Sequence, residues 1–273
     1  MTQTATIITR TGSIQVELPA TDSEVVDGVR WGSVDAFPSP AYWHYQVLSR
    51  RLYGSPAAYK LGRTLAEELG ACLLGGHGIP APVGLAAYER LRARGAFESH
   101  LSQEALESQL REPLMINGRP IRYRFAAQKA KYLAAALPAA QRAPEATSGR
   151  ALRDWLTQLP GVGLKTASWV ARNWMDADDV AILDIHIMRV GQAMGLFPRN
   201  LTVERDYQAL EARFIAFSQG IDVRASELDA VVWYEMASSP STARFLMEAL
   251  SASASGGRRA EKESTPMQLR LAA

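Results

Sequence analysis

The sequence of 273 residues contains one cysteine, Cys72, and only four histidines. A single thiol excludes an intrachain disulfide, a cysteine-rich zinc site and a four-cysteine iron–sulfur cluster. Because the four histidines are spread along the chain, a metal cage made of imidazoles is also disfavoured. We therefore expect no metal cofactor and no iron–sulfur cluster.

Long apolar runs and a strong net charge are missing as well. No run approaches the ~20 apolar residues of a membrane span, and the N-terminus lacks a charged start followed by an apolar core. The net charge is only +2, so any binding to nucleic acid must come from a local patch. With 47% hydrophobic and 21% charged residues, the composition is typical of a soluble globular protein with a sizeable core. We expect a cytoplasmic protein with no membrane partner.

A glycine-rich turn between two helical patterns is the most informative stretch. Apolar residues at 152, 155, 156 and 159 form a helical stripe that ends at Pro160-Gly161-Val162-Gly163, and helical periodicity resumes from Leu164. The free N–H groups at the start of the second helix form a potential phosphate site. The turn joins two helices and has the spacing of neither a P-loop nor a dinucleotide fingerprint, so we expect no nucleotide cofactor.

The residues around this turn resemble those of the helix-hairpin-helix DNA glycosylases, whose hairpin reads Leu-Pro-Gly-Val-Gly. In the 8-oxoguanine branch, a catalytic lysine comes two residues after the last hairpin glycine, and an essential aspartate lies downstream in a Val-Asp-Val-His-like segment. Lys165 stands at the first of these positions. Asp184, within Leu183-Asp184-Ile185-His186, stands at the second with the separation found in the family. The resemblance is strongest over residues 152–196.

This resemblance implies that Lys165 and Asp184 are catalytic. Breaking an N-glycosidic bond builds positive charge on the sugar, and a carboxylate near C1′ stabilises that charge. A deprotonated Lys165 can displace the base and leave a Schiff base, from which elimination cleaves the strand. The pair thus implies a bifunctional glycosylase and lyase for an oxidised purine, with 8-oxoguanine the first candidate. Each residue alone also fits a simpler role, Lys165 as a phosphate contact and Asp184 as a helix N-cap.

The resemblance also implies contacts with double-stranded DNA that contains a damaged or modified base. The hairpin residues Gly161, Val162 and Gly163 would bind the DNA backbone, and the hairpin is compatible with a bound monovalent cation. His186, two residues after the aspartate, would help to organise the site. We expect the protein to act as a monomer.

A basic segment before the hairpin is a second candidate for DNA contact. Its basic residues are Arg111, Arg119, Arg122, Arg124, Lys129 and Lys131, against the single acid Glu112. Tyr123 and Phe125 are interleaved with them and would offer stacking surfaces, while cations such as Arg122, Arg124 and Lys129 would neutralise phosphates. The alternative is a solvated face on an amphipathic helix over residues 124–137.

A late helix, predicted over residues 225–237, supplies candidates for a base pocket. In the 8-oxoguanine enzymes, such a helix provides an aromatic ring that sandwiches the flipped base and, one turn earlier, a polar group that reads its pairing edge. Trp233 and Asp229 stand one turn apart here. The animal enzymes have an amide where this chain has Asp229, which leaves the excised base open. Trp233 also fits a place in the core.

The expected fold is mainly all-α, with two helical lobes, a helix-hairpin-helix motif and a DNA and base cleft between the lobes. We predict an N-terminal segment with short strands over residues 1–23, a helical lobe over 24–138, a catalytic lobe over 149–250 and a flexible tail over 251–273. The strands would form a hairpin around Thr11-Gly12. Further helices are predicted at residues 41–53, 61–74, 83–94, 102–111 and 202–217.

Two other functions remain open at this point. One is a glycosylase with the same chemistry that removes another modified base, including a hypermodified base of foreign DNA. The other is a non-catalytic helix-hairpin-helix module that only binds DNA, in which Lys165 and Asp184 are incidental.

Overall fold

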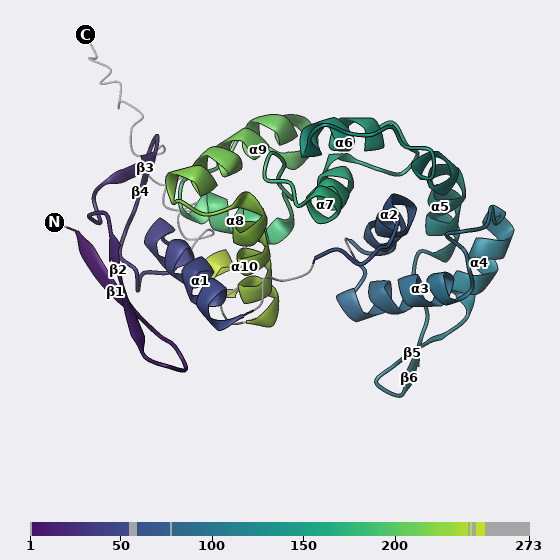
Figure 1. Cartoon of the computed structure of the whole chain (residues 1–273), viewed down its shortest axis with the longest axis horizontal. Helices are drawn as coiled ribbons and strands as arrows, with labels where there is room; N and C mark the ends of the chain where they lie inside the picture. The colour runs from purple at the N-terminus through teal and green to yellow at the C-terminus, as the bar shows by residue number, and fades with distance from the viewer. Residues whose placement is uncertain (1, 55–58, 77, 240, 242–243, 249–273) are drawn as a thin grey trace, which may run out of the picture.

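The computed structural model describes residues 2–54, 59–76, 78–239, 241 and 244–248. These residues form two helical lobes that lie next to each other (Figure 1). The terminal lobe comprises β1 (Gln3–Ile8), β2 (Ser13–Leu18), β3 (Glu24–Val26), β4 (Val29–Arg30), α1 (Pro40–Tyr53), α8 (Ile185–Ala193), α9 (Val203–Gly220) and α10 (Ala225–Ser238). The central lobe comprises α2 (Leu65–Leu74), α3 (Ala81–Ala93), α4 (Gln103–Arg111), β5 (Leu114–Ile116), β6 (Arg119–Ile121), α5 (Ala126–Ala140), α6 (Gly149–Leu156) and α7 (Leu164–Met175). The predicted mainly helical fold with a few short strands is confirmed.

Each lobe has its own hydrophobic core, and the cores divide the chain differently from the predicted domains. Buried residues from Ala66 to Val180 form one cluster, whereas buried residues up to Val47 and from Ala181 onwards form the other. The predicted boundary at residues 138–149 therefore lies inside the central lobe, between α5 and α6. Such a boundary depends on which distant helices pack together, and a polar segment in the sequence does not reveal it. The predicted tail, residues 251–273, lies outside the described residues.

The predicted helices form because their apolar stripes are bounded by capping residues. Ser39 begins α1, with its side chain accepting from the backbone N–H of Tyr42, and Thr64 caps α2 in the same way. Ser148 caps α6 through the N–H of Ala151. These caps place the helix starts within a few residues of the predicted positions.

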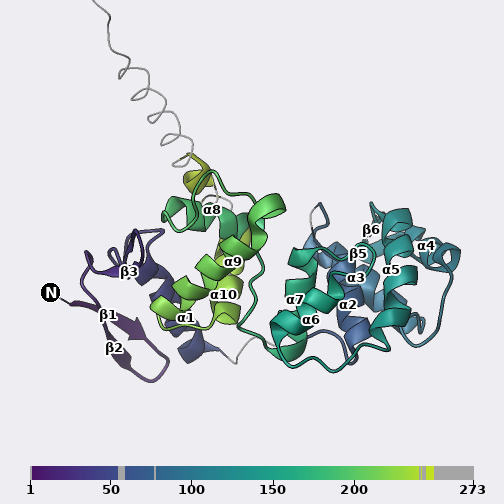
Figure 2. The same cartoon turned by 90° about the horizontal axis from the view of Figure 1, so that it is seen from above.

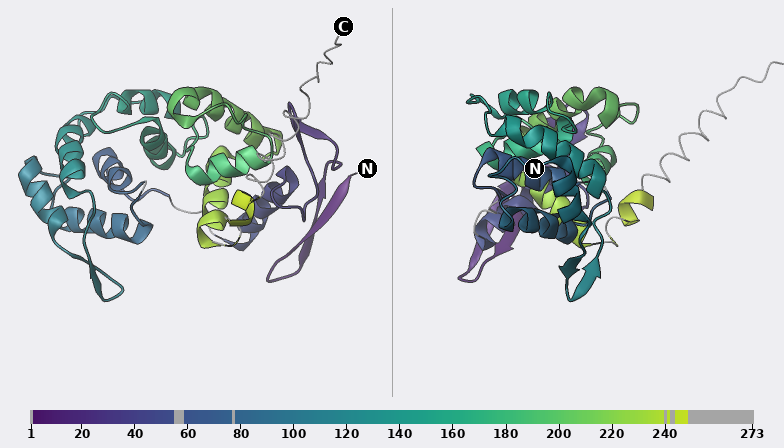
Figure 3. Two further views of the ribbon diagram at one scale, coloured as in Figure 1. Left: turned by 180° about the vertical axis from the view of Figure 1, so that it is seen from behind. Right: turned by 90° about the vertical axis from the view of Figure 1, so that its right-hand side faces the viewer.

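Two hairpins project on the same side of the molecule from opposite ends (Figure 3). The β1–β2 hairpin, in which Ile8 pairs with Ser13, confirms the predicted turn around Thr11-Gly12. The β5–β6 hairpin was not predicted. Its turn consists of Asn117 and Gly118, both with positive φ, which is the pattern that two-residue hairpin turns require.

The two lobes meet along α7, which lies at the edge of the central lobe nearest the terminal lobe (Figure 2). Asp178, just after α7, accepts from the backbone N–H of Ser226 at the start of α10 and pairs with Arg224. The same Arg224 pairs with Asp176. Because these contacts join the end of one helix to the start of another, they fix the two helices relative to each other. No helix in the described residues is long and apolar enough to cross a membrane.

Candidate active site

The hairpin between α6 and α7 uses its two glycines for different purposes. Gly161 has a φ of +79°, and a Cβ there would lie 2.2 Å from Cγ of Tyr132 on α5. Gly163 has no atom within 4 Å of the corresponding position. Val162 between them is buried and anchors the turn in the central core. Gly161 is thus required by the backbone conformation and by close packing, whereas Gly163 faces open space.

Gly163 is also the N-cap residue of α7 and offers no side-chain hydrogen bond to its first turn. The first N–H groups of α7 therefore receive no hydrogen bond from the N-cap side chain, and they lie at the positive end of the helix dipole. An open, uncapped helix start is suited to a phosphate group.

Lys165 is the second residue of α7 and is half-buried. Lys129 of α5 is also half-buried, and its Nζ donates to the carbonyl oxygen of Gly75 at 3.4 Å. Burial lowers the pKa of Lys129, and the positive charge of Lys165 lowers it further. The two ammonium groups therefore lie close enough to repel each other, although they come from different helices.

Asp184 is the N-cap of α8, which is the structural role that the sequence offered as the alternative to catalysis. One carboxylate oxygen, Oδ1, accepts from the backbone N–H groups of His186 at 2.8 Å and Ile187 at 2.9 Å. The side chain is half-buried, and the other oxygen takes no part in the cap. Capping fixes the carboxylate without consuming both oxygens, so the structural role and a catalytic role are compatible. Within the described structure, the buried Nδ1 of His186 has no hydrogen-bond partner.

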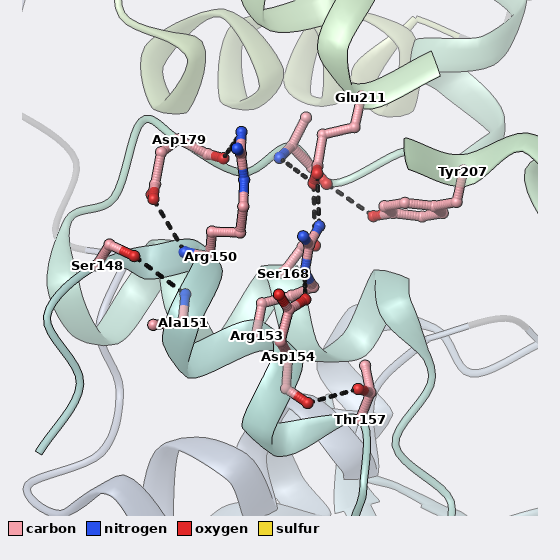
Figure 4. A network of polar contacts seen from close by, with 11 residues as sticks. Ser148, Arg150, Ala151, Arg153, Asp154, Thr157, Ser168, Asp179, Tyr207 and Glu211 are labelled. Atoms are coloured by element: carbon pink, nitrogen blue, oxygen red, sulfur yellow. Dashed lines mark hydrogen bonds and ion pairs between the residues drawn. The ribbon is translucent and has the colours of Figure 1, made fainter. Parts of the chain in front are cut away.

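A buried carboxylate, Glu211 of α9, joins the elements that carry Lys165 and Asp184 (Figure 4). It pairs with the guanidinium of Arg153 on α6 and accepts from the hydroxyl of Ser168, which lies one turn after Lys165 on α7. It also accepts from the backbone N–H of Ala181 at 3.0 Å. One side chain of the terminal lobe thus contacts both helices of the hairpin motif and the segment that leads to Asp184.

Tyr207, one turn before Glu211 on α9, holds the same segment (Figure 4). Its hydroxyl donates to the carbonyl oxygen of Ala181 at 2.7 Å and accepts from the backbone N–H of Leu183 at 3.4 Å. Burial raises the pKa of this phenol, so it stays neutral and able to donate. Together, the two side chains of α9 fix the backbone immediately before Asp184.

Arg172 and Asp229 form a second buried pair between the lobes. Nη2 of Arg172 on α7 lies 3.1 Å from Oδ1 of Asp229 on α10, and both side chains are largely buried. The pKa of Asp229 is raised to about 7, mainly by burial and also by the charges of Asp184 and Asp178, in spite of the nearby guanidinium. Asp229 therefore lies within electrostatic range of Asp184.

Trp233, the predicted sandwiching ring, lies one turn after Asp229 on α10. Its side chain is 44% exposed, so the alternative that it belongs to the core is wrong. A large exposed ring beside a buried polar pair is available for stacking against a base.

The basic segment divides into exposed and structural residues. Arg122 and Arg124 are exposed and remain candidates for phosphate contact. Tyr123, expected to offer a stacking surface, is only 4% exposed, and its hydroxyl donates to the carbonyl oxygen of Leu74 at 2.7 Å. Phe125 packs against the central core. The expectation that Tyr123 offers a stacking surface is therefore wrong, because its ring is buried, whereas the partly buried Phe125 stays a candidate.

Sequence analysis missed Arg153, Arg172 and Glu211. Each is a charged residue within a helix that has apolar residues at nearby positions, as Leu152 and Leu156 are to Arg153. Such neighbours are compatible with a buried ion pair but do not identify the partner. In the described residues, no cluster of His, Cys, Asp and Glu could hold a metal ion.

Comparisons with known proteins agree with the geometry. A family model described as 8-oxoguanine DNA glycosylase matches residues 58–223. The chain is similar to the crystal structure of the 8-oxoguanine DNA glycosylase of Methanocaldococcus jannaschii, with 26% identity and a TM-score of 0.50 over 64% of this chain and 78% of that one. A trapped endonuclease III–DNA covalent intermediate matches with 17% identity and a TM-score of 0.50 over 71% of this chain and 83% of that one, a likeness of fold alone. No curated protein shows significant sequence similarity.

Proposed function

Since the chain belongs to the 8-oxoguanine DNA glycosylase family, we propose that it excises an oxidised purine, 8-oxoguanine first, from double-stranded DNA and then cleaves the strand. The observation that carries this proposal is the arrangement around Glu211. Its contacts with Ser168 and Ala181 join α7, which carries Lys165, to the segment before the capped Asp184. This connection supports the proposal, because attack on C1′ beside a stabilising carboxylate needs a lysine and a carboxylate in one site.

In the proposed reaction, the neutral Nζ of Lys165 attacks C1′ of the damaged nucleotide. The bond from C1′ to the base breaks, and the base leaves with the bonding electrons and gains a proton. The carboxylate of Asp184 stabilises the positive charge that develops on the sugar. Opening of the sugar ring and loss of the amine proton give a Schiff base, and removal of a proton from C2′ then expels the 3′ phosphate.

A lysine can attack carbon only after it has lost its proton. Lys129 brings a second amino group near Lys165, and burial together with the charge of Lys165 lowers the pKa of Lys129. We propose that Lys129 contacts the DNA beside Lys165.

For DNA binding, we propose that the start of α7 and the hairpin backbone contact a phosphate. The open space at Gly163 and the missing side-chain cap support this assignment. The exposed Arg122 and Arg124 would contact further phosphates. Trp233 would stack on the extruded base, and Asp229 would face its pairing edge.

A related function differs only in the base removed. Asp229 is an acid where the animal enzymes have an amide, and it is paired with Arg172. This pair gives the pocket hydrogen-bonding groups of its own, so another modified purine is the second candidate. The same experiment can test both.

Borohydride trapping tests the proposal, because borohydride reduces a Schiff base to a stable bond. The protein would be incubated with three duplexes, containing 8-oxoguanine opposite cytosine, an abasic site, or no damage. We expect covalent adducts with the first two, and none with the Lys165→Gln variant. Arg10→Gln, which changes an exposed cation between β1 and β2, is the control and should trap like the unchanged protein.

Each other outcome has a distinct meaning. Adducts with the abasic duplex alone would support the lyase activity and exclude 8-oxoguanine as a substrate. Duplexes with other modified bases would then be tested. Excision without an adduct would show that water and not Lys165 attacks the sugar. If neither excision nor an adduct occurs while the duplex is bound, the chain is a non-catalytic DNA-binding module.

A further inference from the structure

The guanidinium of Arg172 is buried but only partly paired. Nη2 contacts Asp229, whereas Nε and Nη1 are buried and have no hydrogen-bond partner in the described residues. Buried donors are nearly always satisfied, because leaving one without an acceptor costs its full desolvation energy. Two such donors on one side chain indicate an acceptor that is not among the described residues, such as a bound ligand.

The location of Arg172 indicates which ligand supplies that acceptor. It lies two turns after Lys165 on α7, and residues seven apart share a face of a helix. Its partner Asp229 comes from α10, where Trp233 is exposed one turn later, and interacts electrostatically with Asp184. The unpaired donors therefore belong to the region where the extruded base of the proposed reaction would lie.

The pairing edge of guanine presents, in order, a carbonyl acceptor at O6, a donor at N1–H and a donor at the 2-amino group. Cytosine matches it with one donor followed by two acceptors. A guanidinium donor beside a carboxylate offers the same order, because the carboxylate contributes two acceptor oxygens. Adenine presents the opposite polarity, with a donor at its 6-amino group and an acceptor at N1.

We propose that Arg172 and Asp229 together read the pairing edge of the extruded purine, with Arg172 donating to O6 and Asp229 accepting from N1–H and the 2-amino group. This inference rests on the proposed function and specifies its substrate class as guanine-type purines. Guanine and 8-oxoguanine have the same pairing edge, so the pair selects the purine and not its oxidation. Arg172 is a specificity residue that the sequence resemblance did not indicate.

The ring of Tyr59 covers one face of the Arg172 guanidinium, with Cζ of Arg172 4.1 Å from the ring centroid. Hydrogen bonds to a base would use the N–H groups in the plane of the guanidinium, so they are compatible with this cation–π contact.

The test compares base excision with trapping on an abasic site, which has no base to read. Single-turnover excision would be measured at pH 8, where Asp229 is mostly ionised, on duplexes with 8-oxoguanine or 8-oxoadenine opposite cytosine. Arg172→Met removes all the donors but keeps the length of the side chain. The control is Arg92→Met on α3, since Arg92 also lies over a tyrosine ring, that of Tyr88.

We expect Arg172→Met to slow 8-oxoguanine excision by ~100-fold and to reduce the preference over 8-oxoadenine by a similar factor. Trapping on the abasic duplex should stay within about threefold of the unchanged protein, because Lys165 and Asp184 remain in place. Arg92→Met should leave all three rates unchanged. Should Arg172→Met fail to fold, Arg172→Lys gives the same comparison, since lysine keeps the charge beside Asp229 but lacks the planar fork of donors.

Three results would overturn the inference. Equal losses of excision and abasic trapping would mean that Arg172 only supports the structure around Lys165. An unchanged preference between the two purines would mean that another group reads O6. If the unchanged protein traps no abasic duplex and excises neither base, the proposed function itself fails, and this reading of the pair fails with it.

Discussion

Glu211 on α9 and Arg153 on α6 form an ion pair whose side chains are 4% and 2% exposed. Because α9 belongs to the terminal lobe and α6 to the central lobe, this pair joins the two lobes beneath the hairpin. The same carboxylate accepts from the backbone of Ala181, three residues before Asp184. Glu211 thus connects α7, which carries Lys165, to the segment that leads to Asp184.

We predict that Glu211→Gln strongly destabilises the protein. The change leaves the buried guanidinium of Arg153 with only the partly exposed Asp154 as a charged partner. Breaking a buried pair on one side typically costs ~3–5 kcal/mol, and urea unfolding would measure the loss. Glu204→Gln, at an exposed position in the first turn of α9, is the control and should stay within ~0.5 kcal/mol. Equal, small losses for the two variants would contradict the role given to the pair.

The two hairpin glycines should respond differently to alanine. Gly161→Ala strains a positive φ and places a methyl group against the ring of Tyr132, so it should lower the melting temperature markedly. Gly163→Ala meets no protein atom and should melt like the unchanged protein. Its methyl group would instead stand between the start of α7 and a phosphate, and we expect duplex affinity to fall by ~10-fold. If the Gly163→Ala protein binds duplex DNA with unchanged affinity, the hairpin is not part of the DNA interface.

Asp184 has a structural and a proposed catalytic role that two variants can separate. Asparagine caps a helix about as well as aspartate but carries no charge. Asp184→Asn should therefore keep its stability while excision falls by ~100-fold or more. Asp184→Ala should show the same loss of activity together with ~1 kcal/mol lower stability, because the bonds from His186 and Ile187 are lost. Thermal melting beside single-turnover excision measures both effects. Full activity in Asp184→Asn would refute the catalytic role.

The buried Asp229 should make stability depend on pH. Its pKa is raised to about 7 by burial, whereas an unfolded aspartate ionises near ~3.9. Between these values, the folded protein binds a proton that the unfolded chain has lost, so the free energy of unfolding falls as pH rises from ~4 to ~7. The difference between the unchanged protein and Asp229→Asn should fall across this window by a few kcal/mol, on the order given by linkage. Asp22→Asn, at an exposed position, is the control. A difference that rises with pH would show that the pair with Arg172 outweighs burial.

The helices and the hairpin motif were predictable because their signals are local. Apolar periodicity, the capping serines and the Pro-Gly-Val-Gly turn each lie within a few residues of the element they define. The β5–β6 hairpin was missed although Asn117-Gly118 is a strong turn signal, because the surrounding cations drew the interpretation toward DNA contact. The roles of Lys165 and Asp184 stay predictions.

The buried pairs could not be predicted, because they depend on contacts between distant segments. Arg153 and Glu211 belong to different lobes, as do Arg172 and Asp229. The sequence around each charged residue does not identify its partner, and only the packing of α6 and α7 against α9 and α10 does so. The division into lobes was mislocated for the same reason.

The terminal lobe is made from both ends of the described chain. The order in which the ribosome synthesises these segments therefore affects how the lobe folds. The central lobe arises from consecutive residues and can form its core while translation continues. The apolar face of α1, including the fully buried Trp43, has to wait for α8, α9 and α10. Throughout that interval it is an exposed apolar surface on a nascent chain, of the kind that chaperones protect from aggregation. The interleaving that brings α7 beside α10 thus gives the newly made protein a vulnerable period that a sequential arrangement of lobes would avoid.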